Sequence, residues 1–270
     1  NSILFFALLS FQACTVNNVR EDDGIGDVFE ANKVTGTFGM FDNSRGDFTI
    51  YDLDRFKKPV SPAQTFHLFH TLVALHTGKL ADDSSQVVAN DSTALSLSIY
   101  QVFRKNSVPH FQTLSAIIGQ DTLKYWMDSV KYGNKKIGNE LTQFWMNDSL
   151  TISPDEQLGL IKRLYFRQHP FRASVQEQVK KMMVVVNNAQ YQMAYQLGVV
   201  VRGDKKQAWV VGWIEENRHV PFEIKRVYYL FDTKKLKLEY LAAARKWLDP
   251  EQMAEVKPIS FTNRDGQKIS

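Results

Sequence analysis

The central pattern of hydrophobic positions in the chain lies between Ser61 and Gly78. Within this stretch Phe66, Phe69 and Val73 recur at helical spacing. A proline near its start and a Thr-Gly pair at its end are typical of helix boundaries. The pattern therefore predicts a helix that begins abruptly after a turn and is buried on most of its sides.

The pattern between about residues 80 and 190 is mainly helical. Ser153 marks one helix start clearly, because a first-turn proline and a glutamate three residues on follow it, as in a capping box. Gly119 is a typical helix end. We predict a helical lobe here, with helices at 111–119, 122–130, 153–165 and 174–183.

Strand-like patterns flank the helical lobe on both sides. Before it, residues 35–41 and 47–51 are separated by turn residues, which predicts a hairpin. After it, apolar runs with short turns between them predict antiparallel neighbours, followed by a closing helix. These segments are strands at 195–202, 207–214 and 227–231 and the helix at about 237–248. The expected fold is α+β, with one antiparallel sheet, flanking helices and the helical lobe.

The first residues predict export from the cell. Residues 1–10 form a short apolar run, too brief to span a membrane and typical of the hydrophobic part of a secretory signal peptide. Cys14, the single cysteine, follows a small residue just after this run, as in a loose bacterial lipobox. We predict that residues 1–14 are a truncated signal peptide and that Cys14 is lipidated. The alternative is a cleaved signal with an incidental cysteine.

These residues also set the expected location. A lipidated cysteine would anchor the protein to a membrane of the bacterial envelope, so we expect a periplasmic lipoprotein. Residues 15–33 are largely polar and acidic and contain glycine, which is typical of a flexible tether between an anchor and a domain.

Composition narrows the classes of partner. The 270 residues are 44% hydrophobic and 23% charged, a balance that argues against disorder and allows a substantial core. The formal net charge is only +4, and the basic residues are scattered in pairs along the chain. We therefore expect no binding to nucleic acid.

The stretch that contains the central helix resembles one family. Class D β-lactamases carry a segment close to Pro-Ala-Ser-Thr-Phe-Lys at the start of such a helix, and this chain reads Pro62-Ala-Gln-Thr-Phe-His67 without a gap. Further class D-like marks follow in the family's order: His76-Thr-Gly78, Lys131-Tyr-Gly-Asn-Lys135, Phe144-Trp145 and Val210-Val-Gly-Trp-Ile-Glu215. The resemblance covers residues 34–248.

The resemblance implies the fold of serine β-lactamases and penicillin-binding protein transpeptidases. That fold is a three-layer α/β/α-like arrangement of an antiparallel sheet, flanking helices and a helical lobe. On this basis we predict a β-lactamase-like domain over residues 34–250, with its helical lobe at about 80–190. Residues 251–270 are then a C-terminal tail.

The reactive positions of the family are altered. The resemblance places the nucleophilic serine at Gln64 and the base, a lysine that carries a carbamate, at His67. An amide is no nucleophile for acyl transfer, because its nitrogen lone pair is delocalised. An imidazole forms no stable carbamate. The Ser-x-Val motif has Asn106 at its serine, and the Lys-Thr-Gly motif has Gln196 at its lysine and keeps only Gly198.

The altered positions are candidates to line a pocket. We expect Gln64, His67 and Asn106 to form a buried polar network that links the two lobes. In the family the tryptophan of the Phe-Trp mark packs beside the modified lysine, so Trp145 is expected to pack on His67. The alternative is an ordinary core aromatic. Gln196 and Gly198 complete the candidate pocket.

A metal site is a weaker candidate. His67 and His70 lie three residues apart on the central helix, close enough to chelate a metal ion. No acidic residue within the helix completes a ligand set. We therefore expect neither a metal nor another cofactor.

These observations lead to two functional hypotheses. The first is a β-lactamase-like pseudoenzyme, unable to form a serine acyl-enzyme, that binds a cell-wall peptide or an envelope protein. The second is a hydrolase of the same family with altered chemistry, in which His67 serves as the base and activates a bound water.

Overall fold

The computed structural model describes residues 18–89, 95–216, 227–232, 237–243, 261–262 and 268–269. The chain divides into two units, residues 1–58 and residues 59–270. Cys14 and the predicted signal peptide lie outside the described residues. The boundaries predicted at residues 33 and 250 stay predictions.

The first unit is a small three-stranded sheet with short helices. Strand β3 (Asp47–Tyr51) pairs antiparallel with β2 (Phe38–Asp42) and parallel with β1 (Val19–Glu21). The helical elements are η1 (Asp23–Ile25), α1 (Gly26–Ala31) and α2 (Leu53–Phe56). The hairpin predicted from the turn residues is confirmed.

Part of the predicted tether, residues 15–33, is folded rather than flexible. Strand β1 and helix α1 both lie in it. Its polar sequence contains apolar side chains with partners: Ile25 is buried, and Phe29 stacks on Tyr51 with ring centroids 5.2 Å apart. Burial of apolar surface offsets the entropy lost on ordering such a segment.

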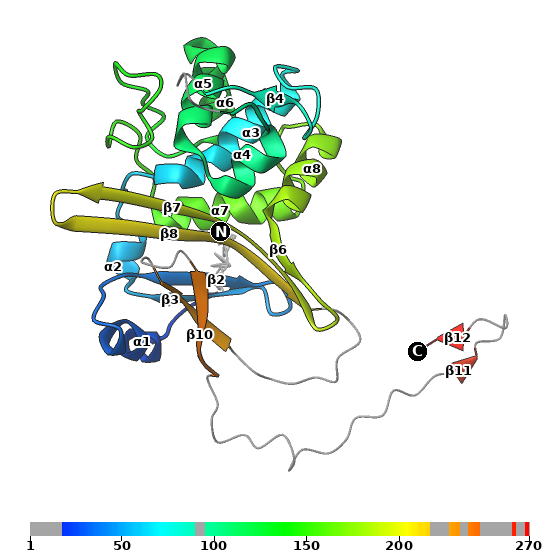
Figure 1. The fold of residues 1–270 in the computed structure, drawn as a ribbon. Helices are drawn as coiled ribbons and strands as arrows, with labels where there is room; N and C mark the ends of the chain where they lie inside the picture. The colour runs from blue at the N-terminus through cyan, green and yellow to red at the C-terminus, as the bar shows by residue number, and fades with distance from the viewer. Residues whose placement is uncertain are drawn as a thin grey trace, which may run out of the picture. The chain divides into compact units, whose positions relative to one another are not determined.

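In the second unit a long hairpin carries helices on one side (Figure 1). Strand β7 (Tyr191–Arg202) pairs along its whole length with β8 (Lys205–Glu216) and also with β6 (Val184–Asn187), all antiparallel. The remaining strands are β4 (Gln86–Val87) paired with β5 (Leu97–Ser98), β9 (Val227–Asp232) paired with β10 (Lys237–Ala243), and β11 (Phe261–Thr262) paired with β12 (Lys268–Ile269).

The helical lobe agrees with its sequence pattern. The helices are η2 (Ala63–Thr65), α3 (Phe66–His76), α4 (Ile99–Lys105), α5 (Val108–Ile118), α6 (Gln120–Val130), α7 (Pro154–Tyr165) and α8 (Ala173–Met183). The capping box at the start of α7 is confirmed. The Ser153 hydroxyl accepts the Glu156 N–H at 3.2 Å, and the Glu156 carboxylate accepts the Ser153 N–H at 2.9 Å.

Helix α3 is the centre of the core. Nearly all of its side chains are buried, and it contacts α4, α5, α6 and α8. The prediction of a helix buried on most sides is therefore confirmed. Its abrupt start takes the form of the short 3₁₀ helix η2, directly after Pro62.

One expectation about the strands is wrong. The described strand pairs are antiparallel, as predicted, apart from β1, which runs parallel to β3. The closing helix expected at 237–248 is a strand over Lys237–Ala243, and residues 244–248 lie outside the described residues. Lys237-Leu-Glu-Tyr240 alternates polar and apolar residues, and only four residues separate it from β9. Both features favour a hairpin partner over a helix.

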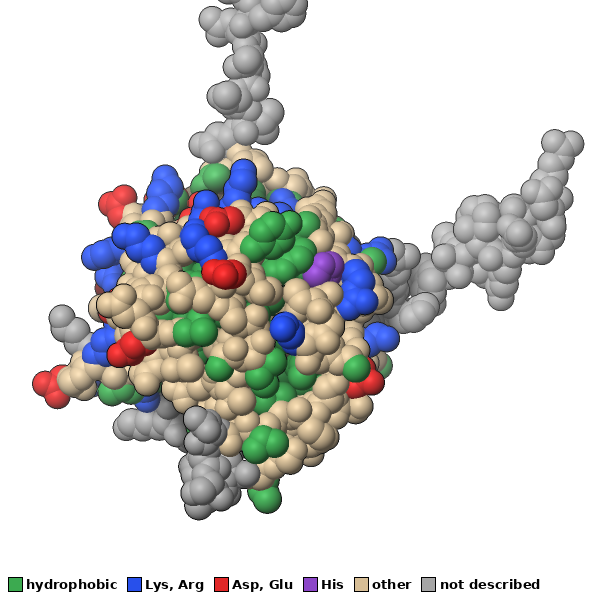
Figure 2. Space-filling model, turned by 90° about the horizontal axis from the view of Figure 1, so that it is seen from above, with side chains coloured by type: hydrophobic (Ala, Val, Ile, Leu, Met, Phe, Trp, Pro, Cys, Tyr) green, Lys and Arg blue, Asp and Glu red, His purple; other side chains and the backbone are tan. Residues whose placement is uncertain are grey.

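The surface seen from above carries basic side chains among acidic and apolar ones (Figure 2). They are dispersed on this face, as the scattered Lys and Arg positions of the sequence indicate. Within the described part of the chain, no helix combines the length and the apolar character needed to cross a bilayer.

Candidate functional site

Four residues singled out from the sequence meet where η2 and α3 begin, α4 ends and β7 passes. Gln64 lies in η2, His67 in the first turn of α3, and Gln196 in β7. Asn106 is the C-terminal cap of α4. His67 and Gln196 are buried, and the other two are half-buried. Residues far apart in the sequence are thus brought into one place.

Asn106 is the hub of the hydrogen bonds at this place. Its Oδ1 accepts the Gln196 Nε2–H at 2.8 Å and lies 2.8 Å from His67 Nδ1. Its Nδ2 donates to the Leu197 carbonyl at 3.0 Å. Because the amide oxygen faces the imidazole, His67 Nδ1 carries the ring proton and donates it. The φ of Asn106 is 55°, a left-handed conformation that asparagine tolerates better than most residues.

The expected polar network is therefore present through His67 and Asn106, with Gln196 as a third member. Gln64 bonds elsewhere. Its Oε1 accepts the backbone N–H of Val199 on β7. Two independent sets of hydrogen bonds thus connect the start of the central helix to the same strand.

Gly198 allows β7 to approach η2 this closely. A Cβ atom at this position would lie 3.0 Å from the Pro62 carbonyl oxygen and 3.0 Å from the Thr65 backbone nitrogen. Contacts of that length are tighter than nine in ten real Cβ contacts, so the backbone of η2 would have to shift to admit a side chain here. The one residue of the third motif that the chain keeps is therefore explained by packing.

Trp145 lies beside His67, as expected from the resemblance, but packs more closely on His70. The ring centroids are 6.2 Å apart for His67 and Trp145, and 4.6 Å apart for His70 and Trp145. His67 itself stacks on Phe111, with centroids 3.8 Å apart and an interplanar angle of 12°. The tryptophan thus has both roles considered for it, packing on His67 and filling the core.

Burial in the core keeps the side chains of His67 and His70 uncharged. It lowers the pKa of His67 to about 3, although the hydrogen bond to Asn106 acts in the opposite direction. Burial, with a smaller contribution from His67, also lowers the pKa of His70. Both rings are therefore neutral at pH 7.

The neutral state of His67 gives a testable dependence of stability on pH. The unfolded chain binds a proton at this residue near the ordinary pKa of 6.5, whereas the folded chain binds it only near 3. Stability is therefore lost as the pH falls from about 6.5 towards about 3, with a slope of roughly 1.4 kcal/mol per pH unit from this residue. In urea unfolding between about pH 6 and pH 4.5, His67→Gln should remove that slope. Equal slopes in both proteins would contradict the buried neutral state.

The neighbouring hydroxyl of Thr65 is fully engaged. It donates to the Pro62 carbonyl at 2.6 Å and accepts from Gln157 Nε2 at 2.7 Å. The side chain is 2% exposed. Thr65 therefore takes no part in the Asn106 network and offers no free nucleophile. Gln157, which holds it, was not identified from the sequence.

A second polar pair beside Asn106 was also missed. The Ser107 hydroxyl lies 2.7 Å from His110 Nδ1, and His110 Nε2 lies 3.0 Å from the Leu95 carbonyl. The carbonyl can only accept, so Nε2 carries the proton and the Ser107 hydroxyl donates to Nδ1. Ser107 is the N-cap residue of α5 and His110 its third residue, but their bond joins two side chains and, unlike a capping box, satisfies no backbone N–H group. The Ser-x-x-His spacing at a helix start is the signal that could have identified it.

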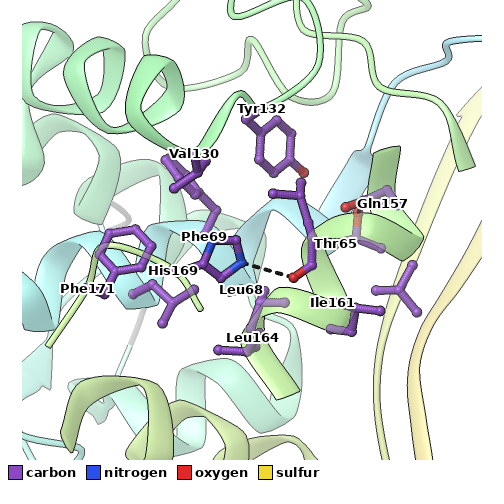
Figure 3. Close-up of a pocket in the computed structure, with 13 residues that line it drawn as sticks. Thr65, Leu68, Phe69, Val130, Tyr132, Gln157, Ile161, Leu164, His169 and Phe171 are labelled. Carbon is purple, nitrogen blue, oxygen red and sulfur yellow. Dashed lines mark hydrogen bonds between the residues drawn. The ribbon is translucent and has the colours of Figure 1, made fainter. Parts of the chain in front are cut away.

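A small cavity lies between α3, α7 and the residues around Tyr132 (Figure 3). Its volume is about 30 Å³, and its lining is mostly apolar, with Thr65, Tyr132, Gln157 and His169 as polar members. Burial raises the pKa of the Tyr132 hydroxyl and lowers the pKa of His169 to about 4. The volume suits a single water molecule and excludes a substrate.

His67 and His70 gain no further ligand for a metal ion from the described residues. Within the described ranges, no group of three or more His, Cys, Asp or Glu side chains is placed to hold a metal ion. The hydrogen-bonded group at the start of α3 is thus made of the neutral side chains of His67, Asn106 and Gln196.

Comparison with known proteins places the chain in a family. The family model of the penicillin binding protein transpeptidase domain matches residues 31–224. The β-lactamase OXA-20 of Pseudomonas aeruginosa is 28% identical over 228 residues, which cover 79% of this chain and 84% of that protein. The regulatory protein BlaR1 of Bacillus licheniformis is 26% identical, over 73% of this chain but only 34% of its own length.

Solved structures of related proteins show the same fold. FUS-1 (OXA-85), a class D β-lactamase from Fusobacterium nucleatum subsp. polymorphum, superimposes with a TM-score of 0.70 at 27% identity, over 73% of this chain and 85% of that one. The C-terminal domain of the BlaR penicillin-receptor of Bacillus licheniformis gives 0.70 at 25%, over 75% and 85%. The predicted serine β-lactamase/transpeptidase fold is confirmed. The chain belongs to the penicillin binding protein transpeptidase domain family and is similar to class D β-lactamases and to the BlaR penicillin-receptor domain.

Proposed function

We propose that this chain is a class D β-lactamase-like domain that forms no serine acyl-enzyme and acts as a binding or interaction module. The observation that carries the proposal is the state of residue 64. An amide stands where the relatives' pattern has its serine, and that amide is bonded to the backbone of β7.

The bond from Gln64 also occupies a donor that acyl transfer would need free. Acyl-transfer sites stabilise the developing oxyanion with backbone N–H groups next to the nucleophile. The Val199 N–H lies next to residue 64 and already donates to Gln64 Oε1. An incoming carbonyl oxygen would have to displace this side chain first. Position 64 thus has no nucleophile, and the backbone N–H of Val199 on β7 already donates to the Gln64 side chain.

The alternative, a hydrolase with His67 as its base, has less support. A general base works best with a pKa near the working pH, whereas burial holds the pKa of His67 at about 3. Its side chain has no exposure to solvent, and its Nδ1 is bonded to Asn106. Substrate would reach the ring only after the Asn106 network had opened.

The proposed partner is a cell-wall peptide or another protein of the envelope. The motivation is the likeness to a domain described as a penicillin-receptor, combined with the altered reactive positions. The proposed location, a membrane-anchored lipoprotein of the periplasm, rests on residues 1–14 of the sequence alone. Isothermal titration with a soluble peptidoglycan peptide tests the first partner. Affinity capture from envelope membranes tests the second.

Incubation with a fluorescent penicillin is expected to leave the intact mass of the protein unchanged. The physical reason is that neither Gln64 nor the engaged Thr65 hydroxyl can attack the lactam carbonyl. The positive control is the C-terminal domain of the BlaR penicillin-receptor of Bacillus licheniformis under the same conditions, which should gain the mass of the acyl group. An adduct on this chain, mapped by peptide mass to Thr65 or Ser107, would refute the proposal.

A further inference from the structure

Four buried nitrogen atoms near the start of α3 have no hydrogen-bond partner among the described residues. They are His67 Nε2, both ring nitrogens of His70, and Trp145 Nε1. All three side chains have no solvent exposure. Their ring centroids lie 4.6 Å apart for His70 and Trp145, and 6.2 Å apart for the other two pairs. A buried polar atom without a partner costs about 1–3 kcal/mol, so four in one place call for a cause.

The hydrogen-bonding roles of two of these atoms follow from their surroundings. An indole nitrogen is always a donor, so Trp145 Nε1–H seeks an acceptor. His67 Nδ1 donates to Asn106, and burial keeps the ring neutral, so His67 Nε2 carries a lone pair and seeks a donor. One donor and one acceptor therefore lie in the same part of the core without bonding to each other.

We propose that His67, His70 and Trp145 form a binding site for one buried water molecule. The water accepts from Trp145 Nε1–H, donates to His67 Nε2 and bonds to one nitrogen of His70. Three hydrogen bonds are typical of buried waters in proteins. Two atoms bridged by one water lie within about 6 Å of each other, a separation that ring nitrogens can have when the ring centroids lie 4.6 Å apart, as for His70 and Trp145, or 6.2 Å apart, as for His67 and Trp145.

The chemistry of the cluster selects a neutral molecule that both donates and accepts. The lone pair of His67 Nε2 repels an anion, and the rings themselves are neutral, so an anion would lack a compensating charge. The second nitrogen of His70 points away from the first and cannot meet the same water. It lies among aromatic rings, of which Phe66 is in edge contact at a centroid distance of 4.5 Å. A ring face is a weak hydrogen-bond acceptor.

The inference goes beyond the proposed function and does not depend on it. A water held between α3 and the Phe144-Trp145 segment would have the same partners whether or not residue 64 could be acylated. It gives His67 a structural role on both sides of its ring, with Asn106 at Nδ1 and the water at Nε2.

The test measures magnetisation transfer from water to indole Hε1 protons in the deuterated, 15N-tryptophan-labelled protein. Trp145 Hε1 should give a cross-peak to a long-lived water. Trp209 is the matched control: it is also buried, but its Nε1–H already donates to the Ser61 carbonyl at 2.8 Å, so it should give none. The Trp145 signal is assigned by its loss in Trp145→Phe or, if that variant does not fold, by its contacts with the His70 ring.

Removal of the acceptor completes the test. His67→Leu takes away the lone pair and should weaken or abolish the cross-peak at Trp145 while leaving Trp209 unchanged. The absence of a cross-peak at Trp145 in the unaltered protein would overturn the proposal, as would equal cross-peaks at both tryptophans.

A crystal structure gives a second readout that does not depend on variants. Density within about 3.2 Å of both His67 Nε2 and Trp145 Nε1 is expected. Its absence would also refute the site.

Discussion

Replacement of Asn106 with alanine is expected to lower the free energy of unfolding by about 3–5 kcal/mol. The side chain serves three partners at once: His67 Nδ1–H, Gln196 Nε2–H and the Leu197 carbonyl. His67 and Gln196 are buried, so water cannot easily replace the lost acceptor. Each group left without a partner costs about 1–3 kcal/mol, so three groups give roughly 3–9 kcal/mol, and relaxation of the neighbours places the expected loss in the lower part of that range. Chemical denaturation of the two proteins measures the difference.

A second helix end provides the matched control. Lys131 is the C-cap of α6 with a φ of 59°, close to the 55° of Asn106 at the end of α4. Its side chain is exposed. Lys131→Ala therefore places alanine in the same left-handed conformation without disturbing a buried network, and should change stability by less than about 0.5 kcal/mol. Similar losses in both variants would assign the effect at Asn106 to the backbone instead of the network.

The distance in sequence between bonded residues decides which features the sequence alone could predict. The central helix, the β2–β3 hairpin and the capping box at Ser153 depend on residues close in the sequence, and all three were predicted. The bond from Gln64 to Val199 spans 135 positions and the bond from Gln196 to Asn106 spans 90. Before the structure was known, only the resemblance to a family placed Gln64, Asn106 and Gln196 in one pocket.

The predictions that failed concern contacts whose partners could not be identified from the sequence. Gln64 was expected to join His67 and Asn106, but an amide oxygen bonds to whichever donor the fold brings near, and β7 brings the Val199 N–H. The strand β10 was predicted as a helix, although Lys237-Leu-Glu-Tyr240 alternates polar and apolar residues, and its antiparallel pairing with β9 follows that alternation. The bond between the Ser107 and His110 side chains was not predicted, and it depends on the start of α5 at Val108.

Truncation of Phe66 to alanine is expected to cost about 3–5 kcal/mol of unfolding free energy, a loss comparable to that of the Asn106 network. Phe66 begins α3 and has no solvent exposure. Its ring is in edge contact with His70, Tyr132 and Phe144, at centroid distances of 4.5, 5.0 and 5.2 Å. Alanine would leave a cavity lined by rigid aromatic rings, which can close in only partly.

An exposed aromatic residue separates this packing loss from a general effect of removing a ring. Tyr125 on α6 is 64% exposed, so Tyr125→Ala should change stability by less than about 0.5 kcal/mol. Phe66→Leu should fall between the two, because leucine keeps part of the buried volume. If Phe66→Ala cost no more than Tyr125→Ala, the start of α3 would be loosely packed. The tight burial of His67 one residue away, on which the water site and the argument against His67 as a general base depend, would then be untenable.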